Sequence, residues 1–137
     1  MSQYSMKTYD HATLLKEAGL VAASAAGSII LDLGNGFMEA DLIIDISALE
    51  VAGGDEIYTI SLEGSAVAAM TSGSVELAKA TFGNNPAPAD ADTAVGRHMV
   101  PITNELNGTL YRYVRLYTTV AGVIATGINY SAFLAKK

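Results

Sequence analysis

This 137-residue chain has few of the histidine and cysteine residues that hold transition metals in proteins. The chain contains two histidines, His11 and His98, and no cysteine. Zinc sites are built mainly from cysteine, histidine and carboxylate ligands, and no carboxylate lies at a ligand spacing from either histidine. Asp90 and Asp92 resemble the start of a calcium-binding loop, but the glycine and the distal glutamate of that motif are missing. We therefore expect no metal site, and we interpret the acidic segment as a solvated loop.

The serines and glycines also lack the sequence context of catalysis. No serine lies in a G-x-S-x-G turn, and no spacing indicates a histidine and an aspartate beside one. The segment Gly34–Gly36 lacks both the dinucleotide fingerprint and the Lys-Ser/Thr ending of a phosphate loop, so we interpret it as a turn. Asp32, Asp45 and Glu63 could form a glycosidase pair only if two of them faced each other, which the sequence does not establish. We expect no enzymatic activity and no cofactor.

The clearest candidates for binding are tyrosines that alternate along the segment Thr109–Val120. Tyr111, Tyr113, Arg115 and Tyr117 share one parity. The other parity is aliphatic with one basic exception: Leu110, Arg112, Val114, Leu116 and Val120. A period of two separates the faces of a strand, and tyrosine and arginine are enriched where proteins meet. The tyrosine parity therefore predicts a subunit contact, or else a face that packs under a second sheet.

Segments that favour β-structure recur along the chain, with turn residues between them. Seven are readable: Ser28–Leu33, Ala40–Ser47, Asp55–Ser65, Ser74–Phe82, Arg97–Thr103, Thr109–Val120 and Gly127–Ala135. The small residues before Gly27 can supply an eighth, and Asn107-Gly108 is a strong hairpin signal. Regularly spaced strands without a long helix predict an all-β fold, an antiparallel jelly roll or β-sandwich of about eight strands. We expect a single sandwich domain over residues 28–137.

Residues 1–27 differ from the rest of the chain, and we predict that they form an N-terminal arm. A short helix over Ala12–Ala18 and an extended arm are both compatible with this segment. Its bulky apolar residues are too few and too dispersed to form a core of their own. Those that we expect to contact another subunit or a partner protein are Tyr4, Tyr9, Leu14 and Leu15.

The charges are divided along the chain, whose net charge is -6. No basic residue lies between Lys16 and Lys79, where most of the carboxylates fall. Either the two halves interleave in one sheet system and neutralise each other, which we expect, or they form complementary surfaces between subunits. An acidic chain with few basic residues is a poor candidate for nucleic-acid binding. The sequence has neither the apolar run of a membrane span nor the pattern of a secretory signal, so we expect a cytoplasmic product.

Several of these segments together resemble a known family. The stretch AASAAG leads into SIILDLGNG, YTISLEGS follows in the middle, and the chain ends with YRYVRLYTTVAGVIATGINYSAFLAKK. This pattern, over roughly Ser24 to Lys137, resembles the jelly-roll capsid cement (decoration) proteins of tailed bacteriophages. Arg112–Leu116 and the Gly127–Leu134 ending are its most specific parts. The long arm Met1–Ala23 and the Pro/Asp-rich loop at 84–94 depart from the family pattern.

The resemblance implies a structural virion protein without catalysis. Such a protein is made in the host cytoplasm and binds the outer surface of the capsid. Homotrimers at three-fold and quasi-three-fold positions would bridge the major capsid protein and hold the shell against internal DNA pressure. A different class of function is also open: a monomeric carbohydrate- or ligand-binding β-sandwich module that uses the tyrosine face as its platform. A trimer favours the first function, and a monomer favours the second.

Overall fold

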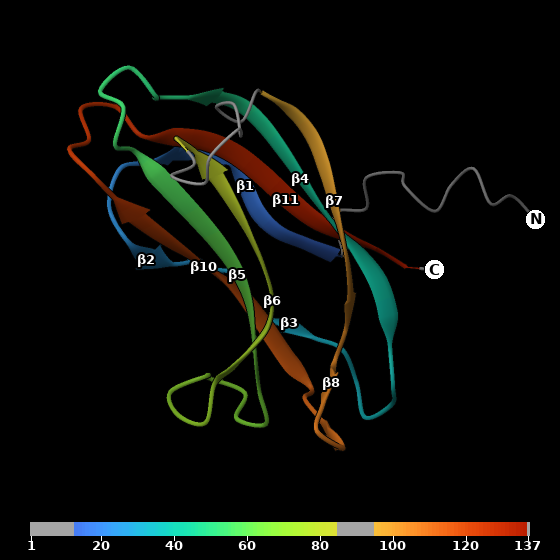
Figure 1. The fold of residues 1–137 in the computed structure, drawn as a ribbon. Coiled ribbons are helices and arrows are strands. Elements are labelled where there is room, and N and C mark those ends of the chain that lie inside the picture. Colours follow the sequence, from blue (N-terminus) through green and yellow to red (C-terminus); the bar gives the residue numbers. More distant parts are fainter. Residues whose placement is uncertain (1–12, 85–94, 137) are drawn as a thin grey trace, which may run out of the picture.

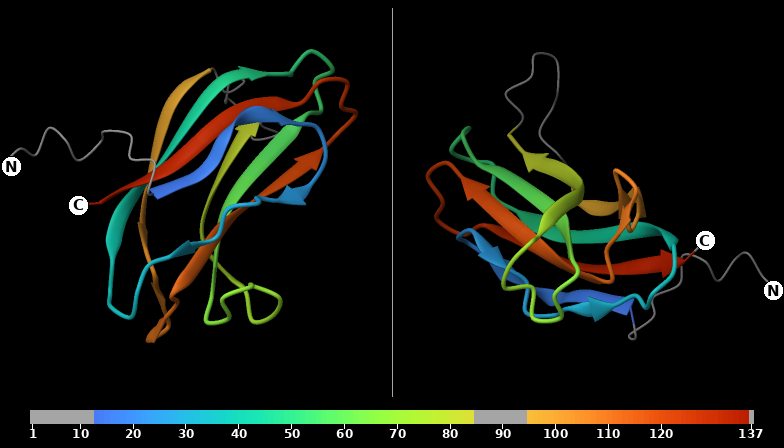
Figure 2. Two further views of the ribbon diagram at one scale, coloured as in Figure 1. Left: turned by 180° about the vertical axis from the view of Figure 1, so that it is seen from behind. Right: turned by 90° about the horizontal axis from the view of Figure 1, so that it is seen from below.

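The structure is a computed structural model that describes residues 13–84 and 95–136. Two antiparallel sheets pack face to face in it (Figures 1 and 2). These two packed sheets confirm the prediction of an all-β sandwich. The described residues contain no helix with the length and apolar character needed to cross a membrane.

The first sheet has four strands in the order β1-β11-β4-β7, and every neighbouring pair is antiparallel. Its strands are β1 (Leu14–Val21), β4 (Glu39–Leu49), β7 (Gly96–Thr103) and β11 (Ile128–Lys136). The second sheet has five strands in the order β2-β10-β5-β6, with β3 also paired to β10. Its strands are β2 (Ala25–Ala26), β3 (Leu31–Asp32), β5 (Ile57–Ser65), β6 (Val75–Gly83) and β10 (Tyr113–Ala121). A separate hairpin joins β8 (Glu105–Leu106) to β9 (Thr109–Leu110).

The order of the strands is that of a jelly roll. The two short strands β2 and β3 both pair with β10, so they can be counted as one interrupted strand. The sandwich then has eight strands in chain order: β1, β2/β3, β4, β5, β6, β7, β10 and β11. In this numbering the four-stranded sheet reads 1-8-3-6 and the other sheet reads 2-7-4-5. Jelly rolls occur in both viral capsid proteins and lectins, so the fold alone does not choose between the two expected functions.

The core lies between the sheets and follows the predicted alternation. Alternate residues of the long strands point inward, where each fully buried Leu or Ile side chain contributes about 1.5–3 kcal/mol. The central part of this core consists of Leu42, Ile44, Ile46, Tyr58, Ile60, Leu62, Val114, Leu116, Ile128, Tyr130, Ala132 and Leu134. The opposite parity of the same strands faces outward and carries most of the polar residues.

The segment that includes Leu14–Val21 differs from the prediction, because it forms the edge strand β1 rather than a helix or an arm. Its pairing with β11 shifts register twice, between Leu14 and Lys16 and between Lys16 and Gly19. These irregularities break the alternation that would have identified a strand in the sequence. The Lys16 ammonium supports the irregular strand by donating to the carbonyls of Glu17, Gly19 and Tyr130 at 2.9–3.0 Å. The described sandwich therefore starts at β1, and the expected boundary at residue 27 is corrected.

Candidate functional site

Tyr113, Arg115 and Tyr117, which we call the tyrosine row, lie on the outer face of the five-stranded sheet. The residues that alternate with them, Val114, Leu116 and Thr118, are buried in the interior. The aliphatic parity of this segment is therefore the core face. The alternative that the tyrosine parity packs under a second sheet is excluded for these three residues.

The cross-strand neighbours of the two tyrosines have short side chains, and the two rings are only partly buried. Tyr113 lies between Asp32 of β3 and Ser65 of β5, and Tyr117 lies between Ala26 of β2 and Ser61 of β5. The result is a sheet face on which two aromatic rings project above shorter side chains. Such rings can bury a large area on contact with a partner at a low cost in conformational entropy.

Arg115 at the centre of the tyrosine row is held in place by Glu63. Its Nε donates to Glu63 Oε1 at 3.0 Å, and the two side chains are only 22% and 23% exposed. Glu63 lies directly opposite Arg115 across the β10–β5 pair. A partly buried cross-strand pair of this kind fixes the guanidinium between the two tyrosines before any partner binds.

Tyr111 does not belong to the tyrosine row, contrary to the prediction. Strand β10 begins only at Tyr113, so the strict alternation does not extend back to residue 111. The backbone N–H of Tyr111 donates to Asn104 O at 2.8 Å. A Cβ added to the buried Gly64 would lie 3.0 Å from Tyr111 Cβ, which places Tyr111 against the end of the sandwich. The sequence signal that could have separated Tyr111 from the tyrosine row is Arg112. A charged residue does not suit a position whose side chain would face the core, so the alternation has to begin after it.

Arg112 precedes the strand and pairs with Asp32 instead of entering the core. Its Nε and Nη2 donate to the two carboxylate oxygens of Asp32 at 2.6 and 2.8 Å. Its guanidinium also lies 5.3 Å from the ring centroid of Tyr113. The hydrogen bonds from Arg112, with one from the Gly34 N–H, lower the pKa of Asp32 to about 2. This ion pair borders the tyrosine row at the β3 side.

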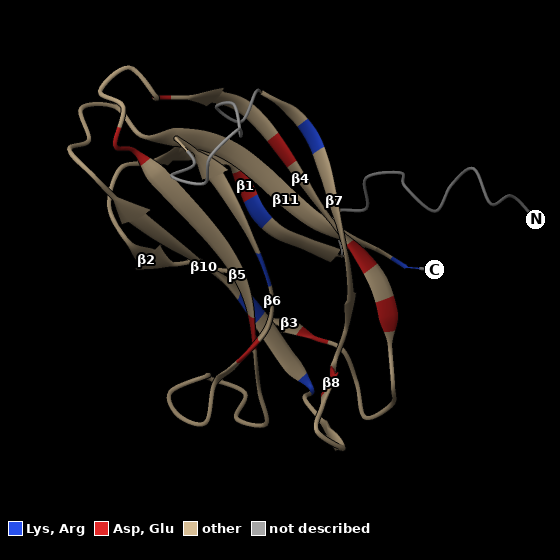
Figure 3. Cartoon of the chain, in the orientation of Figure 1, with Lys and Arg blue, Asp and Glu red and all other residues tan. Residues whose placement is uncertain are grey.

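Acidic and basic residues lie on neighbouring strands of the fold (Figure 3), and ion pairs join the acidic part of the chain to the basic part. The pairs are Arg97–Asp45, Arg112–Asp32, Arg115–Glu63 and Lys79–Glu76. Each pair joins an acid from the segment 32–76 to a base from the segment 79–115. The expectation that the two halves interleave and neutralise each other within the fold is confirmed for these residues.

The predicted contact residues near the N-terminus divide into two groups. Leu14 and Leu15 are 5% and 0% exposed within the single chain. A side chain that is already buried has no surface left to offer a partner, so their expected interface role is corrected to a role within the subunit. Tyr4 and Tyr9 lie outside the described residues.

His98 is directed inward and packs on Phe82, with the ring centroids 4.9 Å apart. In the part of the chain that the structure describes, no group of three or more His, Cys, Asp or Glu side chains is placed to hold a metal ion. His11, Asp90 and Asp92 lie outside that part. The expectations about metals, cofactors and catalysis stay predictions.

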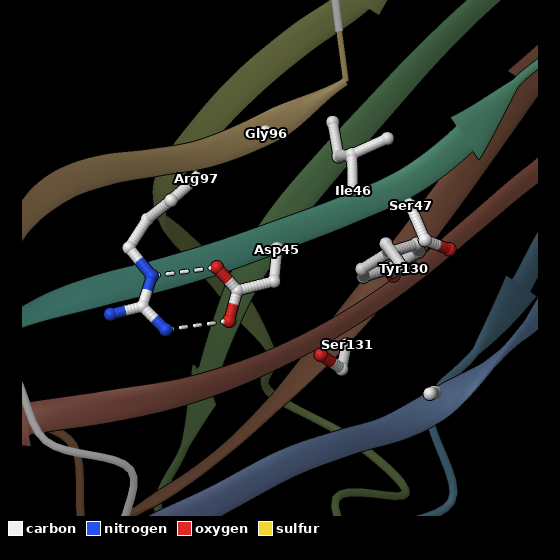
Figure 4. Close-up of a pocket in the computed structure, with 8 residues that line it drawn as sticks. Asp45, Ile46, Ser47, Gly96, Arg97, Tyr130 and Ser131 are labelled. Carbon is white, nitrogen blue, oxygen red and sulfur yellow. Dashed lines mark hydrogen bonds and ion pairs between the residues drawn. The ribbon is translucent and has the colours of Figure 1, made fainter.

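A second candidate site lies on the outer face of the four-stranded sheet, where a hollow of about 280 Å³ opens (Figure 4). Asp45 of β4 lies opposite both Ser131 of β11 and Arg97 of β7. Arg97 donates from Nε and Nη2 to Asp45 at 2.7 and 2.9 Å. Sequence reasoning missed this site because its residues are far apart in the chain and only the strand register brings them together.

The chain matches no protein-family model, and no curated protein is significantly similar to it.

Proposed function

We propose that this chain is a structural virion protein, a trimeric capsid cement protein on the outer surface of a tailed-phage head. In this proposal, trimers occupy three-fold positions and hold adjacent copies of the major capsid protein together. The observation that carries the proposal is the tyrosine row, which holds two partly exposed aromatic rings and a fixed arginine on the outer face of the five-stranded sheet. The jelly-roll topology and the resemblance of the segment patterns are consistent with it.

The edges of the two sheets are poorly suited to self-association, which favours the face as the contact surface. An edge strand invites strand addition when it is long and regular. Here β1 shifts register twice, and the pairing of β6 with β5 shifts at Leu62/Glu63. The edge strand β7 contains Pro101, which has no N–H to donate. A trimer contact is therefore best placed on the outer face that carries the tyrosine row.

A cement protein acts by binding and not by chemistry. Each subunit of a trimer would make the same contact with the capsid, so three modest contacts combine into one strong attachment. Binding that requires the assembled shell stabilises that shell against disassembly by mass action. The protein would be made in the host cytoplasm and would end on the capsid exterior.

Two measurements test this proposal. Size-exclusion chromatography with light scattering should give the mass of three chains, each of 14.2 kDa. Co-sedimentation with phage heads that lack a cement protein should then place the trimer in the pellet. A monomer at all concentrations, with no sedimentation, would overturn the proposal and favour the monomeric binding module.

The binding-module alternative uses the same tyrosine row as a platform for a carbohydrate or another ligand. Tyr113 and Tyr117 are separated by four residues, which is about 13 Å along an extended strand. Arg115 lies between them as a hydrogen-bond donor. A ligand that bound there would have to be long enough to contact both rings, and would be expected to bind a monomer.

A further inference from the structure

The β3–β4 loop and the β8–β9 hairpin lie at the same end of the sandwich (Figures 1 and 2), and each displays one large apolar side chain. Phe37 in the loop is 58% exposed, and Leu110 in the hairpin is 42% exposed. Neither belongs to the hydrophobic core. Single exposed apolar residues are common on protein surfaces, so two of them indicate an interaction site only where the fold holds them together.

The side chain of Asn104 ties the loop to the hairpin. It is fully buried, and its Nδ2 donates to the carbonyl oxygens of Gly36 and Tyr111 at 3.0 and 3.2 Å. Its Oδ1 accepts from the N–H of Met38 at 2.9 Å. One buried amide therefore fixes the backbone next to both exposed apolar residues, and its own hydrogen-bonding groups are satisfied in doing so.

The hairpin is also closed by its own contacts. Asn107 and Gly108 have φ values of +53° and +83°, which suit a tight two-residue hairpin turn. The Glu105 carboxylate accepts from the Gly108 N–H at 2.5 Å. Leu110 is therefore presented by a preorganised turn, and a partner that binds it does not have to order the chain first.

The charges around this end are acidic. Glu39 at the exposed start of β4 is two residues from Phe37, and Glu105 lies opposite Leu110 in the β8–β9 pair. Within the described part of the chain neither carboxylate forms an ion pair. The nearby Arg112 is neutralised by its bidentate pair with a different carboxylate. The rim of the two apolar side chains is therefore negative.

A negative rim around two apolar side chains restricts the kind of partner. Anionic lipid surfaces and nucleic acids would be repelled by it. A second copy of this chain is poorly matched, because all of its arginines form ion pairs within the subunit. A different protein that offers lysine or arginine around an apolar pocket is complementary both in charge and in apolar character.

We propose that Phe37 and Leu110, with Glu39 and Glu105 at their rim, form a docking surface for a second protein that presents an apolar pocket bordered by lysine or arginine. The inference rests on the proposed function, under which that protein is the major capsid protein. The tyrosine row would then hold the subunits together while this end of the sandwich binds the shell. The two surfaces belong to different segments, so each can be altered alone.

The test is co-sedimentation of the full chain with phage heads that lack a cement protein. The double variant Phe37→Ser with Leu110→Ser should lower the affinity about tenfold or more, as expected when two anchors of a contact are truncated. It should keep the wild-type melting temperature and light-scattering mass, because both side chains lie outside the core. The matched control is Val123→Ser, which removes an 80% exposed side chain from the β10–β11 loop at the opposite end of the sandwich (Figure 1) and should leave the affinity unchanged.

The charged rim is tested by a second double variant, Glu39→Gln with Glu105→Gln. The amide oxygen that replaces the Glu105 carboxylate can still accept from the Gly108 N–H, so the hairpin stays closed. This variant should bind heads about threefold to tenfold more weakly at low salt, and its binding should depend less on salt concentration than that of the wild type. Wild-type affinity and salt dependence in this variant would overturn the assignment of a basic partner.

The outcomes separate this inference from the proposed function. A wild-type chain that does not sediment with heads would overturn both. If the wild type binds heads and the folded Phe37→Ser, Leu110→Ser double variant binds equally well, only the inference is overturned. Equal weakening by Val123→Ser, or stronger binding to anionic vesicles than to heads, would also overturn it. Phe37→Ser alone decides the question if the double variant does not retain the native melting temperature.

Discussion

The hydroxyl groups of Thr118 and Tyr130 lie 2.5 Å apart in the interior and join the two sheets. Thr118 belongs to β10 in the five-stranded sheet and Tyr130 to β11 in the other. Burial raises the pKa of Tyr130 to about 12, so the phenol stays protonated at neutral pH. Two polar groups in an apolar core satisfy each other here, and neither is free to turn to water.

The first prediction is that Tyr130→Phe lowers the free energy of unfolding by about 1–2 kcal/mol, because it leaves the buried Thr118 hydroxyl without this partner. Chemical denaturation measures the change. The double variant Thr118→Val with Tyr130→Phe removes both polar groups and should be less destabilised than the two single changes together predict. Strict additivity would show that the two hydroxyls do not interact.

A second prediction concerns acid. The pKa of Asp32 is lowered to about 2 by its hydrogen bonds with Arg112 and the Gly34 N–H, whereas an unfolded aspartate titrates near 3.8. A carboxyl group whose pKa is lower in the folded state stabilises that state at pH values above its pKa in the unfolded state. This stabilisation is lost as the pH falls from about 4 through about 2. Asp32→Asn should therefore lose less stability than the wild type in that window. An NMR titration of the Asp32 carboxyl with a midpoint near 4 would contradict this prediction.

The parts of the fold that sequence could predict are those in which burial enforces a strict period of two. In β10 one parity faces the core and the other faces outward, so burial alternates along the strand, whereas β4 and β11 also bury Ile43, Phe133 and Ala135 on the outward parity. The outward direction of Tyr113, Arg115 and Tyr117 follows from the same rule. The ion pairs between the two halves of the chain were also expected, since acid-rich strands had to lie beside basic ones.

The parts that sequence could not predict depend on local breaks in that period. The two register shifts of β1 place Lys16, Glu17 and Ala18 where no simple alternation would put them. The late start of β10 separates Tyr111 from the tyrosine row. The pairing of Asp45 with Arg97 depends on the register between β4 and β7, and the two residue types alone do not predict that register.

A third prediction compares two glycines that both require a positive φ. Gly127 has φ +106, and a Cβ there would collide with the backbone of Val21 and Ala22; Gly73 has φ +67 and open space around it. Both alanine variants carry the cost of a left-handed backbone, which is about 1 kcal/mol or more. Gly127→Ala should lose about 1–3 kcal/mol beyond Gly73→Ala, because its backbone neighbours must also move. Equal melting temperatures for the two variants would show that the turn into β11 can relax.

The fourth prediction concerns the start of the sandwich. Leu15 is fully buried and packs in the main core, so Leu15→Ala should lower the free energy of unfolding by about 2–5 kcal/mol. A chain that lacks residues 1–19 loses most of β1 with Leu15, and should be destabilised at least as much. A chain that lacks only residues 1–12 keeps all the described strands and is the matched control. If the shorter deletion lowers the melting temperature as much as the longer one, β1 is not what stabilises this edge.

The last prediction tests the tyrosine row as the subunit contact. Tyr113→Ala removes a ring that is directed away from the core, so the variant should keep its β-type circular dichroism and most of its thermal stability. If Tyr113 lies in the centre of a trimer contact, truncation should cost more than 1 kcal/mol per contact and shift the trimer toward monomer in light scattering. Met99→Ala is the control, because it removes an exposed apolar side chain, 53% accessible, from the opposite sheet. A Tyr113→Ala variant that remains trimeric would move the contact off this face, and one that unfolds would assign Tyr113 to the stability of the subunit itself.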